Sequence, residues 1–244
     1  MEDLETFERY YVAARVKESR VYTDAQVRQL PEMAPGHLYC QEWKIRKRSA
    51  ERFLKALSAE KKPLSLLEIG CGNGWLARQC ALIPGVRVTG LDINTMELKQ
   101  AQRVFQQQEN LQFIAGDIRS GILQGRKFDR VVFAAAIQYF PSVREILGVV
   151  SDHLAENGEI HILDSFFYDK RELADARSRT QAYYHALGVP EMTAYYFHHA
   201  LDDLTPYPYQ IVTRHSWLKR LIAGPEKVFP WIKIKKSMPY RPGV

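Results

Sequence analysis

The sequence of 244 residues contains few cysteines and no long apolar run, and both shortages limit its class. The three cysteines, Cys40, Cys71 and Cys80, do not have the spacing of metal ligands. No apolar stretch reaches the roughly 20 residues that a membrane-spanning helix needs. The acidic residues 1–5 lack the basic and then apolar order of a signal peptide. These features predict a cytoplasmic protein without a metal site or a membrane span.

The signatures of several enzyme classes are also missing. The chain has no G-x-S-x-G of hydrolases, no Walker-type G-K-[ST] of phosphate-binding loops and no H-E-x-x-H of zinc peptidases. Its composition is that of an ordinary globular protein, with 46% hydrophobic and 25% charged residues. The length suits one α/β domain with added elements.

The net charge of +6 is unevenly distributed along the chain. Residues 214–244 contain eight lysines and arginines and a single acid, Glu226. A second basic run covers residues 44–48. Such runs can attract nucleic acids or acidic ligands, although they more often form the solvated faces of helices and edge strands.

The middle of the chain alternates between apolar strands and capped helices. The predicted strands are 64–69, 86–91, 111–115, 128–135 and 159–165, and the predicted helices are 75–83, 94–105 and 142–158. Two closing strands, 210–213 and 228–234, flank a predicted helix at 217–223. This order predicts an α/β fold with a doubly wound, mostly parallel seven-stranded sheet of the Rossmann-like type.

Other segments predict additions to this sheet. Helical spacing of apolar residues over 4–20 and 41–57 predicts a helical N-terminal cap, residues 1–60, before a main domain, residues 61–244. Residues 169–209 form a helical, aromatic-rich insertion before the last strands, in a position suited to a substrate lid.

The stretch LLEIGCGNGWL, residues 66–76, places Gly70, Gly72 and Gly74 directly after a strand. Glycines at such a turn let the backbone approach a ligand at the carboxyl edge of a parallel sheet, which predicts a nucleotide-type site. A dinucleotide is one candidate, because residues 72–77 fit G-x-G-x-x-A and Asp92 ends the next strand. Against it, Trp75 would open the helix that receives the pyrophosphate, and no tyrosine is followed by a lysine four residues later.

The other candidate is S-adenosylmethionine, because the chain resembles the class I S-adenosylmethionine-dependent methyltransferases of the small-molecule type, including quinone-biosynthesis enzymes. The resemblance covers about residues 64–165 and rests on motifs in the family's order: E-x-G-x-G-x-G at 68–74, GLDI at 90–93, AGDI at 115–118, FDRVVF at 128–133, AIQYFP at 136–141 and NGEI at 157–160. The ordered set is specific, whereas each motif alone is not.

The resemblance implies the residues that bind the cofactor. Asp92 would accept hydrogen bonds from the ribose hydroxyls, Ile93 would lie against the adenine, and Asp117 would meet its amino group. Glu68 would lie near the cationic methionine end. The full predicted set is Glu68, Gly70, Cys71, Gly72, Gly74, Asp92, Ile93, Asp117, Ile118 and Ala134, with Trp43 added from the N-terminal cap and Arg46 as a partner for the cofactor carboxylate.

Methyl transfer from a sulfonium is an in-line displacement in which the protein supplies position and electric field. A general base matters when the acceptor is a hydroxyl, phenol, ammonium or acidic carbon. The candidates are Tyr139, after the fourth strand, and His199 in the aromatic insertion. Substrate contacts are expected from Gln138, Tyr195, Tyr196 and His198. The aromatic insertion predicts a small aromatic or apolar acceptor, methylated on O, N or C. The N-terminal helices and the aromatic insertion are expected to close the cleft in which the transfer takes place.

Two other functions stay open. The basic ends suggest a nucleic-acid methyltransferase, although no asparagine precedes a proline and no cysteine follows the fourth strand, as such enzymes would require. A non-catalytic subunit that binds the cofactor to stabilise a partner is the third reading. The sequence fixes neither the acceptor nor the oligomeric state, so a homodimer is also left open.

Overall fold

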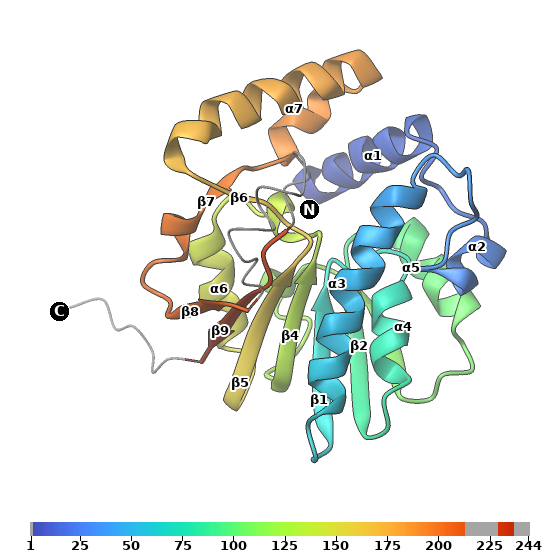
Figure 1. Cartoon of the computed structure of the whole chain (residues 1–244), viewed down its shortest axis with the longest axis vertical. Helices are drawn as coiled ribbons and strands as arrows, with labels where there is room; N and C mark the ends of the chain where they lie inside the picture. Colours follow the sequence, from blue (N-terminus) through green and yellow to red (C-terminus); the bar gives the residue numbers. More distant parts are fainter. Residues whose placement is uncertain (1, 213–228, 237–244) are drawn as a thin grey trace.

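A central sheet organises the chain, of which the computed structural model describes residues 2–212 and 229–236 (Figure 1). Its strands follow the order β3-β2-β1-β4-β5-β9-β8. The first five are parallel, and β9 is antiparallel to both of its neighbours. The bounds are β1 Leu64–Ile69, β2 Val86–Asp92, β3 Leu111–Ala115, β4 Phe128–Ala134, β5 Leu154–Leu163, β8 Tyr209–Ile211 and β9 Ile232–Lys235. The predicted mostly parallel seven-stranded sheet is confirmed.

Helices cover both faces of this sheet, which explains why the central strands β1 and β4 are buried along most of their length. On one face, Phe53 of α3 and Leu76 of α4 share a buried core with Leu66 of β1. On the other face, Leu147 of α6 packs with Leu67 of β1. The helices that form these layers are α3 (Cys40–Ser58), α4 (Trp75–Ala81), α5 (Thr95–Val104) and α6 (Val143–Ser151).

Side-chain caps begin two of these helices where the sequence predicted them. The Asn94 side chain accepts a hydrogen bond from the Glu97 amide at the start of α5, and the Ser142 hydroxyl accepts one from the Glu145 amide at the start of α6. The predicted end of the second helix at residues 157–158 is wrong, because α6 ends at Ser151 and β5 already begins at residue 154.

The early start of β5 has a tertiary cause. The amide of Phe128, the first residue of β4, donates to the His153 carbonyl at 2.8 Å, and Phe128 pairs with Leu154. Pairing with a neighbouring strand therefore overrides the local Asn157-Gly158 turn signal, which lies inside the extended segment.

Two helices that are far apart in the sequence lie together beyond the carboxyl edge of the sheet (Figure 1). They are α1 (Glu2–Lys17) and α7 (Leu173–Leu187). Lys17 donates to the Gly188 carbonyl at 2.6 Å, and the Tyr183 hydroxyl donates to Glu18. The N-terminal cap and the insertion therefore contact each other, while their division into domains stays a prediction.

The remaining elements are short. Helix α2 (Asp24–Gln29) has no counterpart among the predicted elements, although Thr23 and Gln26 form a capping box in front of it. A two-stranded sheet joins β6 (Phe167–Tyr168) to β7 (His199–Ala200). The 3₁₀ turns are η1 (Ile118–Ser120), η2 (Ile137–Tyr139), η3 (Lys170–Glu172), η4 (Pro190–Tyr195) and η5 (Leu201–Leu204).

The predicted closing strands are present with shifted bounds, as β8 and β9. The predicted helix at 217–223 lies outside the described residues. Within the described ranges, no helix is both long enough and apolar enough to cross a membrane.

Candidate active site

The glycine turn after β1 forms part of the wall of a cavity of about 360 Å³ at the carboxyl edge of the sheet. Gly70 and Gly72 line this cavity and have φ angles of 72° and 51°, which favour glycine. A Cβ atom on Gly70 would lie 2.6 Å from the Cβ of Ala136, so a larger residue would displace the loop after β4. The glycines therefore allow the turn to approach both that loop and the cavity.

Asp92, at the end of β2, fixes the position of this turn. One carboxylate oxygen accepts from the Gly72 amide at 2.6 Å, and the other accepts from the Asn94 amide at 2.8 Å. Burial raises the pKa of Asp92, whereas these backbone amides act in the opposite direction. Asp92 also lines the cavity, so its carboxylate can accept further hydrogen bonds from a ligand.

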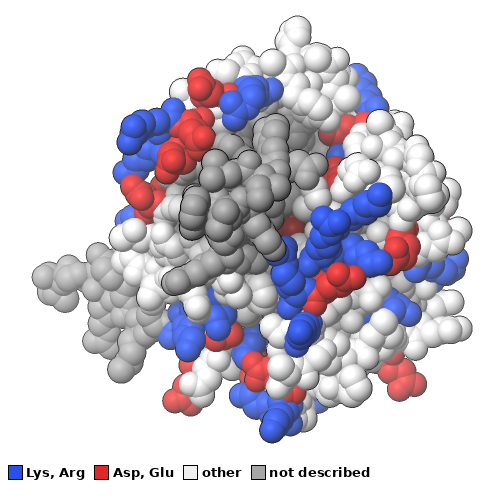
Figure 2. All heavy atoms as spheres, in the orientation of Figure 1, with Lys and Arg blue, Asp and Glu red and all other residues white. Residues whose placement is uncertain are grey.

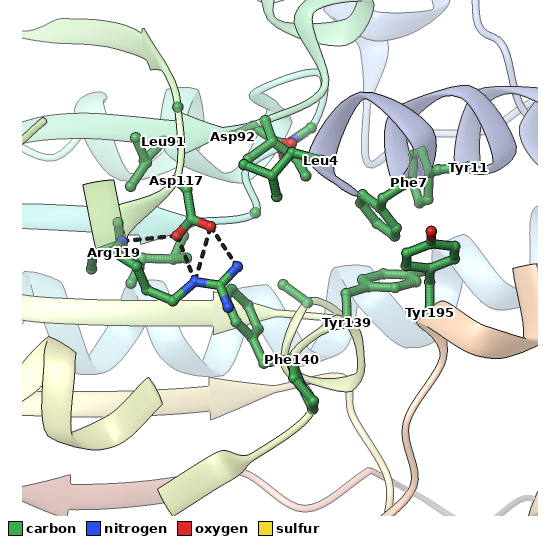
Figure 3. Close-up of a pocket in the computed structure, with 18 of the residues that line it drawn as sticks. Leu4, Phe7, Tyr11, Leu91, Asp92, Asp117, Arg119, Tyr139, Phe140 and Tyr195 are labelled. Carbon is green, nitrogen blue, oxygen red and sulfur yellow. Dashed lines mark hydrogen bonds and ion pairs between the residues drawn. The ribbon is translucent and has the colours of Figure 1, made fainter. Parts of the chain in front are cut away.

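Asp117 lies at one end of the cavity and forms an ion pair with Arg119 (Figure 3). The Arg119 backbone amide donates to one Asp117 oxygen at 2.8 Å, and the guanidinium contacts both oxygens. Burial alone would raise the pKa of Asp117, but the hydrogen bonds and charge of Arg119 lower it. Leu91, Ile93 and Ile118 supply apolar walls at the same end.

Aromatic rings form the opposite end of the cavity (Figure 3). The ring of Phe7 in α1 lies 5.7 Å from Tyr139 in η2 and 5.5 Å from Tyr195 in η4, measured between centroids. Tyr11 meets Tyr139 edge-on at 5.5 Å. Burial raises the pKa of both Tyr11 and Tyr139, so each phenol keeps its proton near neutral pH.

A smaller cavity of about 60 Å³ adjoins the main one, and we call it the polar annex. It shares Tyr11, Gly70, Gly72 and Ala135 with the main cavity. Its charged lining residues are Arg15, Arg20, Arg46, Glu68 and Glu97.

Glu68 is the deepest carboxyl group of the polar annex, at 2% exposure. Its Oε2 atom has no hydrogen-bond partner in the structure. Burial raises the pKa of Glu68 well above its usual range, and the neighbouring charge of Asp92 acts in the same direction. An unpartnered buried oxygen beside a cavity is a group that a bound ligand can satisfy.

These features fit S-adenosylmethionine. The main cavity offers an acidic group at each of two successive strand ends, and the polar annex offers charges of both signs for an amino-acid head. Asp92 would hold the ribose, Asp117 and Ile118 the adenine, and the residues of the polar annex the methionine end.

The structure brings most of the predicted site residues together. Gly70, Gly72, Asp92, Ile93, Asp117, Ile118, Tyr139 and Tyr195 line the main cavity, and Trp43, Glu68, Cys71, Arg46 and Ala134 line the polar annex. The Trp43 indole donates to the Tyr22 hydroxyl at 2.9 Å. Arg46 pairs with Glu42 at 3.0 Å.

Five predicted residues are absent from the described walls of both cavities: Gly74, Gln138, Tyr196, His198 and His199. Gly74 caps α4 and has Phe113 behind it. The side-chain amide of Gln138 donates to the Ala135 carbonyl at 2.7 Å, and the ring of Tyr196 packs against that of Tyr139.

The two histidines are both buried and bonded to the protein. His198 Nε2 lies 2.9 Å from the Thr180 hydroxyl, and His199 Nε2 lies 3.3 Å from the Ile137 carbonyl. Burial lowers the pKa of each imidazole. His199 is therefore oriented toward the backbone of η2, and a role as base would require this contact to break.

The sequence predicted a cleft closed by the N-terminal helices, but it named no residue of α1 as part of the site. Leu4, Phe7 and Tyr11 line the main cavity, and Arg15 lines the polar annex. Helical spacing had already placed Leu4, Phe7 and Tyr11 on one face of a predicted helix, but not Arg15. The spacing did not show that this face lines the cavity. Arg119 was missed as well, because an exposed basic residue after an acid has no signature.

Comparison with known proteins agrees with this geometry. Residues 66–158 match the family described as a methyltransferase domain. The predicted resemblance to class I S-adenosylmethionine-dependent methyltransferases is confirmed over this range.

Two relatives illustrate the similarity. The malonyl-[acyl-carrier protein] O-methyltransferase of Halalkalibacterium halodurans is 28% identical over 132 residues, which are 50% of this chain and 49% of that protein. The trans-aconitate 2-methyltransferase of Deinococcus radiodurans is 32% identical over 122 residues, 50% of this chain and 45% of that protein. The chain thus matches about half the length of these relatives.

The fold also matches solved structures. The plantazolicin methyltransferase BpumL in complex with SAH aligns over 97% of this chain and 98% of its own, with a TM-score of 0.56 and 18% identity. At this identity the match establishes the fold, and it agrees with the Rossmann-like methyltransferase class predicted from the sequence.

Proposed function

We propose that this protein transfers a methyl group from S-adenosylmethionine to a small-molecule acceptor on O, N or C. The observation that carries the proposal is one cavity that joins the glycine turn, Asp92 and Asp117 to an aromatic end formed by α1, η2 and η4. Bound S-adenosylmethionine supplies an activated methyl group for in-line displacement. Of the relatives named above, the trans-aconitate 2-methyltransferase is named for a small-molecule acceptor, which supports the proposal.

The chain's own residues would position the two reactants. Asp92 and Asp117 anchor the adenosine, and the rings of Phe7, Tyr139 and Tyr195 surround the space next to it. Enclosure by rings excludes water and holds the acceptor in line with the methyl group, and this displacement requires no covalent bond to the protein. An aromatic or apolar acceptor suits these walls. Tyr139 is proposed as a positioning hydrogen-bond donor, since its phenol stays protonated.

The first test is binding. Calorimetry with S-adenosylhomocysteine should give saturable 1:1 binding to the full chain. Asp92→Ala should weaken that binding by about a hundredfold, because two charge-assisted hydrogen bonds are lost. The exposed Asp175→Ala on α7 is the matched control and should bind as the unmodified protein does. Equal affinity in Asp92→Ala would remove the cofactor assignment.

The second test is turnover. Radiolabelled S-adenosylmethionine is incubated with a panel of aromatic and apolar acids, phenols and amines, and methylated product is measured. Product formation from at least one acceptor supports an enzyme. Cofactor binding without transfer to any acceptor would favour the non-catalytic partner function instead. The cytoplasmic location and the homodimer stay predictions, to be checked by fractionation and by light scattering.

A further inference from the structure

Glu97 is a charged group of the site to which the sequence motifs assign no role. It is the third residue of α5, and its carboxylate accepts from the Asn94 side-chain amide at 3.0 Å. A Cβ atom on Gly72 would lie 3.2 Å from Glu97 Oε2. The carboxylate therefore lies directly over the glycine turn, in the wall of the polar annex.

The groups that face Glu97 come from five other segments. Tyr11 and Arg15 come from α1, Arg46 from α3 and Asp92 from β2, and Cys71 and Glu68 belong to the turn and the strand before it. Both arginines also have other partners in the protein.

Arg15 donates to the Tyr11 hydroxyl at 2.7 Å and pairs with Glu18 at 3.4 Å. Arg46 pairs with Glu42 at 3.0 Å. The polar annex thus places carboxyl groups beside the glycine turn and guanidinium groups on the N-terminal helices. This arrangement of both signs is complementary to an α-amino-acid zwitterion.

Two carboxyl groups could hold the positive end of such a zwitterion. Glu68 is almost fully buried, and burial keeps its carboxyl group protonated. Glu97 is only partly buried and feels the charge of Arg15, so it can ionise near neutral pH. An ionised carboxylate binds an ammonium group more strongly than a neutral one does. Glu97 is therefore the better partner.

We propose that Glu97 binds the α-ammonium group of the cofactor's methionine end and makes the site specific for adenosine ligands that carry an amino acid. This inference rests on the proposed function. With the adenosine at Asp92 and Asp117, the rest of the cofactor would pass the shared residues Gly70 and Gly72 into the polar annex.

The proposal has a pH dependence with a defined sign. Burial raises the pKa of Glu97 to about 7, and Arg15 limits the rise. Below pH 7 the carboxyl group is protonated and loses its charge interaction with the ammonium, so affinity falls as pH falls. Protonation of Asp92 would weaken the binding of every adenosine ligand, whereas protonation of Glu97 would weaken only the binding of ligands that carry the ammonium group.

Two ligands separate these effects. S-adenosylhomocysteine carries the amino-acid head, and 5′-methylthioadenosine has the same adenosine and thioether without it. Calorimetry with the full chain measures both ligands at pH 5.5 and pH 7.5. The proteins are the unmodified chain, Glu97→Gln and the exposed control Glu109→Gln, with thermal unfolding midpoints to verify the fold.

We expect S-adenosylhomocysteine to bind about tenfold more weakly at pH 5.5 than at pH 7.5 in the unmodified protein and in Glu109→Gln. In Glu97→Gln it should bind equally weakly at both pH values. Affinity for 5′-methylthioadenosine should be the same in Glu97→Gln and the unmodified chain.

Two results would overturn the assignment. Unchanged binding of S-adenosylhomocysteine by Glu97→Gln at pH 7.5 would show that Glu97 does not meet the ammonium. An equal loss of affinity for both ligands in Glu97→Gln would place Glu97 at the adenosine instead. If the unmodified protein binds neither ligand, the proposed function itself fails, and this inference fails with it.

Discussion

The Arg119 side chain forms an ion pair with the Asp117 carboxylate, the group that we expect to accept from the adenine amino group. Its guanidinium contacts both oxygens of Asp117 at the end of the main cavity. The Arg119 side chain is half exposed, so the ion pair is weak in free energy and easily displaced. Cofactor binding should therefore compete with an internal contact of the protein.

Replacement of this side chain tests the competition. Arg119→Gln should raise the affinity for S-adenosylhomocysteine by up to about fivefold, since no ion pair has to break. In the unmodified protein, affinity for 5′-methylthioadenosine, which lacks the charged amino-acid head, should also rise with salt, because salt screens the pair between Arg119 and Asp117. Calorimetry at two ionic strengths measures both effects, with Arg144→Gln on α6 as control. A loss of affinity in Arg119→Gln would mean that the guanidinium contacts the ligand instead.

At the residue scale, the sequence predicted the parts of the site that lie in consecutive motifs. Asp92 ends one strand and Asp117 follows the next, and parallel strands bring their carboxyl ends to one edge. The motifs of the family that the chain resembles therefore predicted both at the site. His199 was predicted from its residue type and from its place in the aromatic insertion. Its contact with Ile137, across 62 residues of sequence, could not be derived from any local pattern.

The element that shapes the site most, apart from the sheet, is α1. One face supplies Leu4, Phe7 and Tyr11 to the main cavity, and Glu8 accepts from the amide and the hydroxyl of Thr95 at the start of α5. At its other end, Lys17 binds the Gly188 carbonyl. The helix is therefore attached near its middle and at its C-terminal end.

This arrangement predicts that ligand binding stabilises α1. Hydrogen–deuterium exchange of the amides in residues 5–17 should slow by about tenfold when S-adenosylhomocysteine saturates the protein, because bound ligand fills the space beneath the helix. Helix α6, none of whose residues lines the cavity, is the internal control and should change little. Protection at the end of β2 without any change in α1 would contradict the proposed role of the helix.

Helical periodicity predicted α1 and α3, but not which residues of the insertion they contact. Both were assigned to an N-terminal cap because apolar residues recur on one face. The bond between Tyr183 and Glu18 joins residues 165 positions apart, and the packing of η4 against α1 is equally distant in sequence. Such contacts depend on the complementary shapes of two surfaces, which no single segment encodes.

At the scale of the molecule, basic side chains gather over α3 on one face (Figure 2). The exposed basic residues of this helix are Lys44, Arg48, Arg52 and Lys55. Acidic side chains lie among them, Glu51 included. Most of the basic residues in the chain's last 31 positions fall outside the described ranges. The argument for a nucleic-acid substrate therefore rests on the basic charge of these parts of the sequence.

Filter binding with RNA and with DNA tests that alternative. We expect only non-specific binding, with a Kd no tighter than about 10⁻⁶ M near physiological salt and steep weakening as salt rises. Nucleic acid added at about 10⁻⁶ M should not inhibit binding of S-adenosylhomocysteine. Tight binding that persists at high salt, or that depends on base sequence, would favour a nucleic-acid methyltransferase.

The most direct test of the account is a crystal structure of the protein with S-adenosylhomocysteine. We predict the adenine at Asp117 and Ile118, the ribose at Asp92 and the homocysteine end in the polar annex, with the sulfur facing the aromatic end of the main cavity. An empty cavity, or a nicotinamide cofactor bound there in its place, would contradict the account.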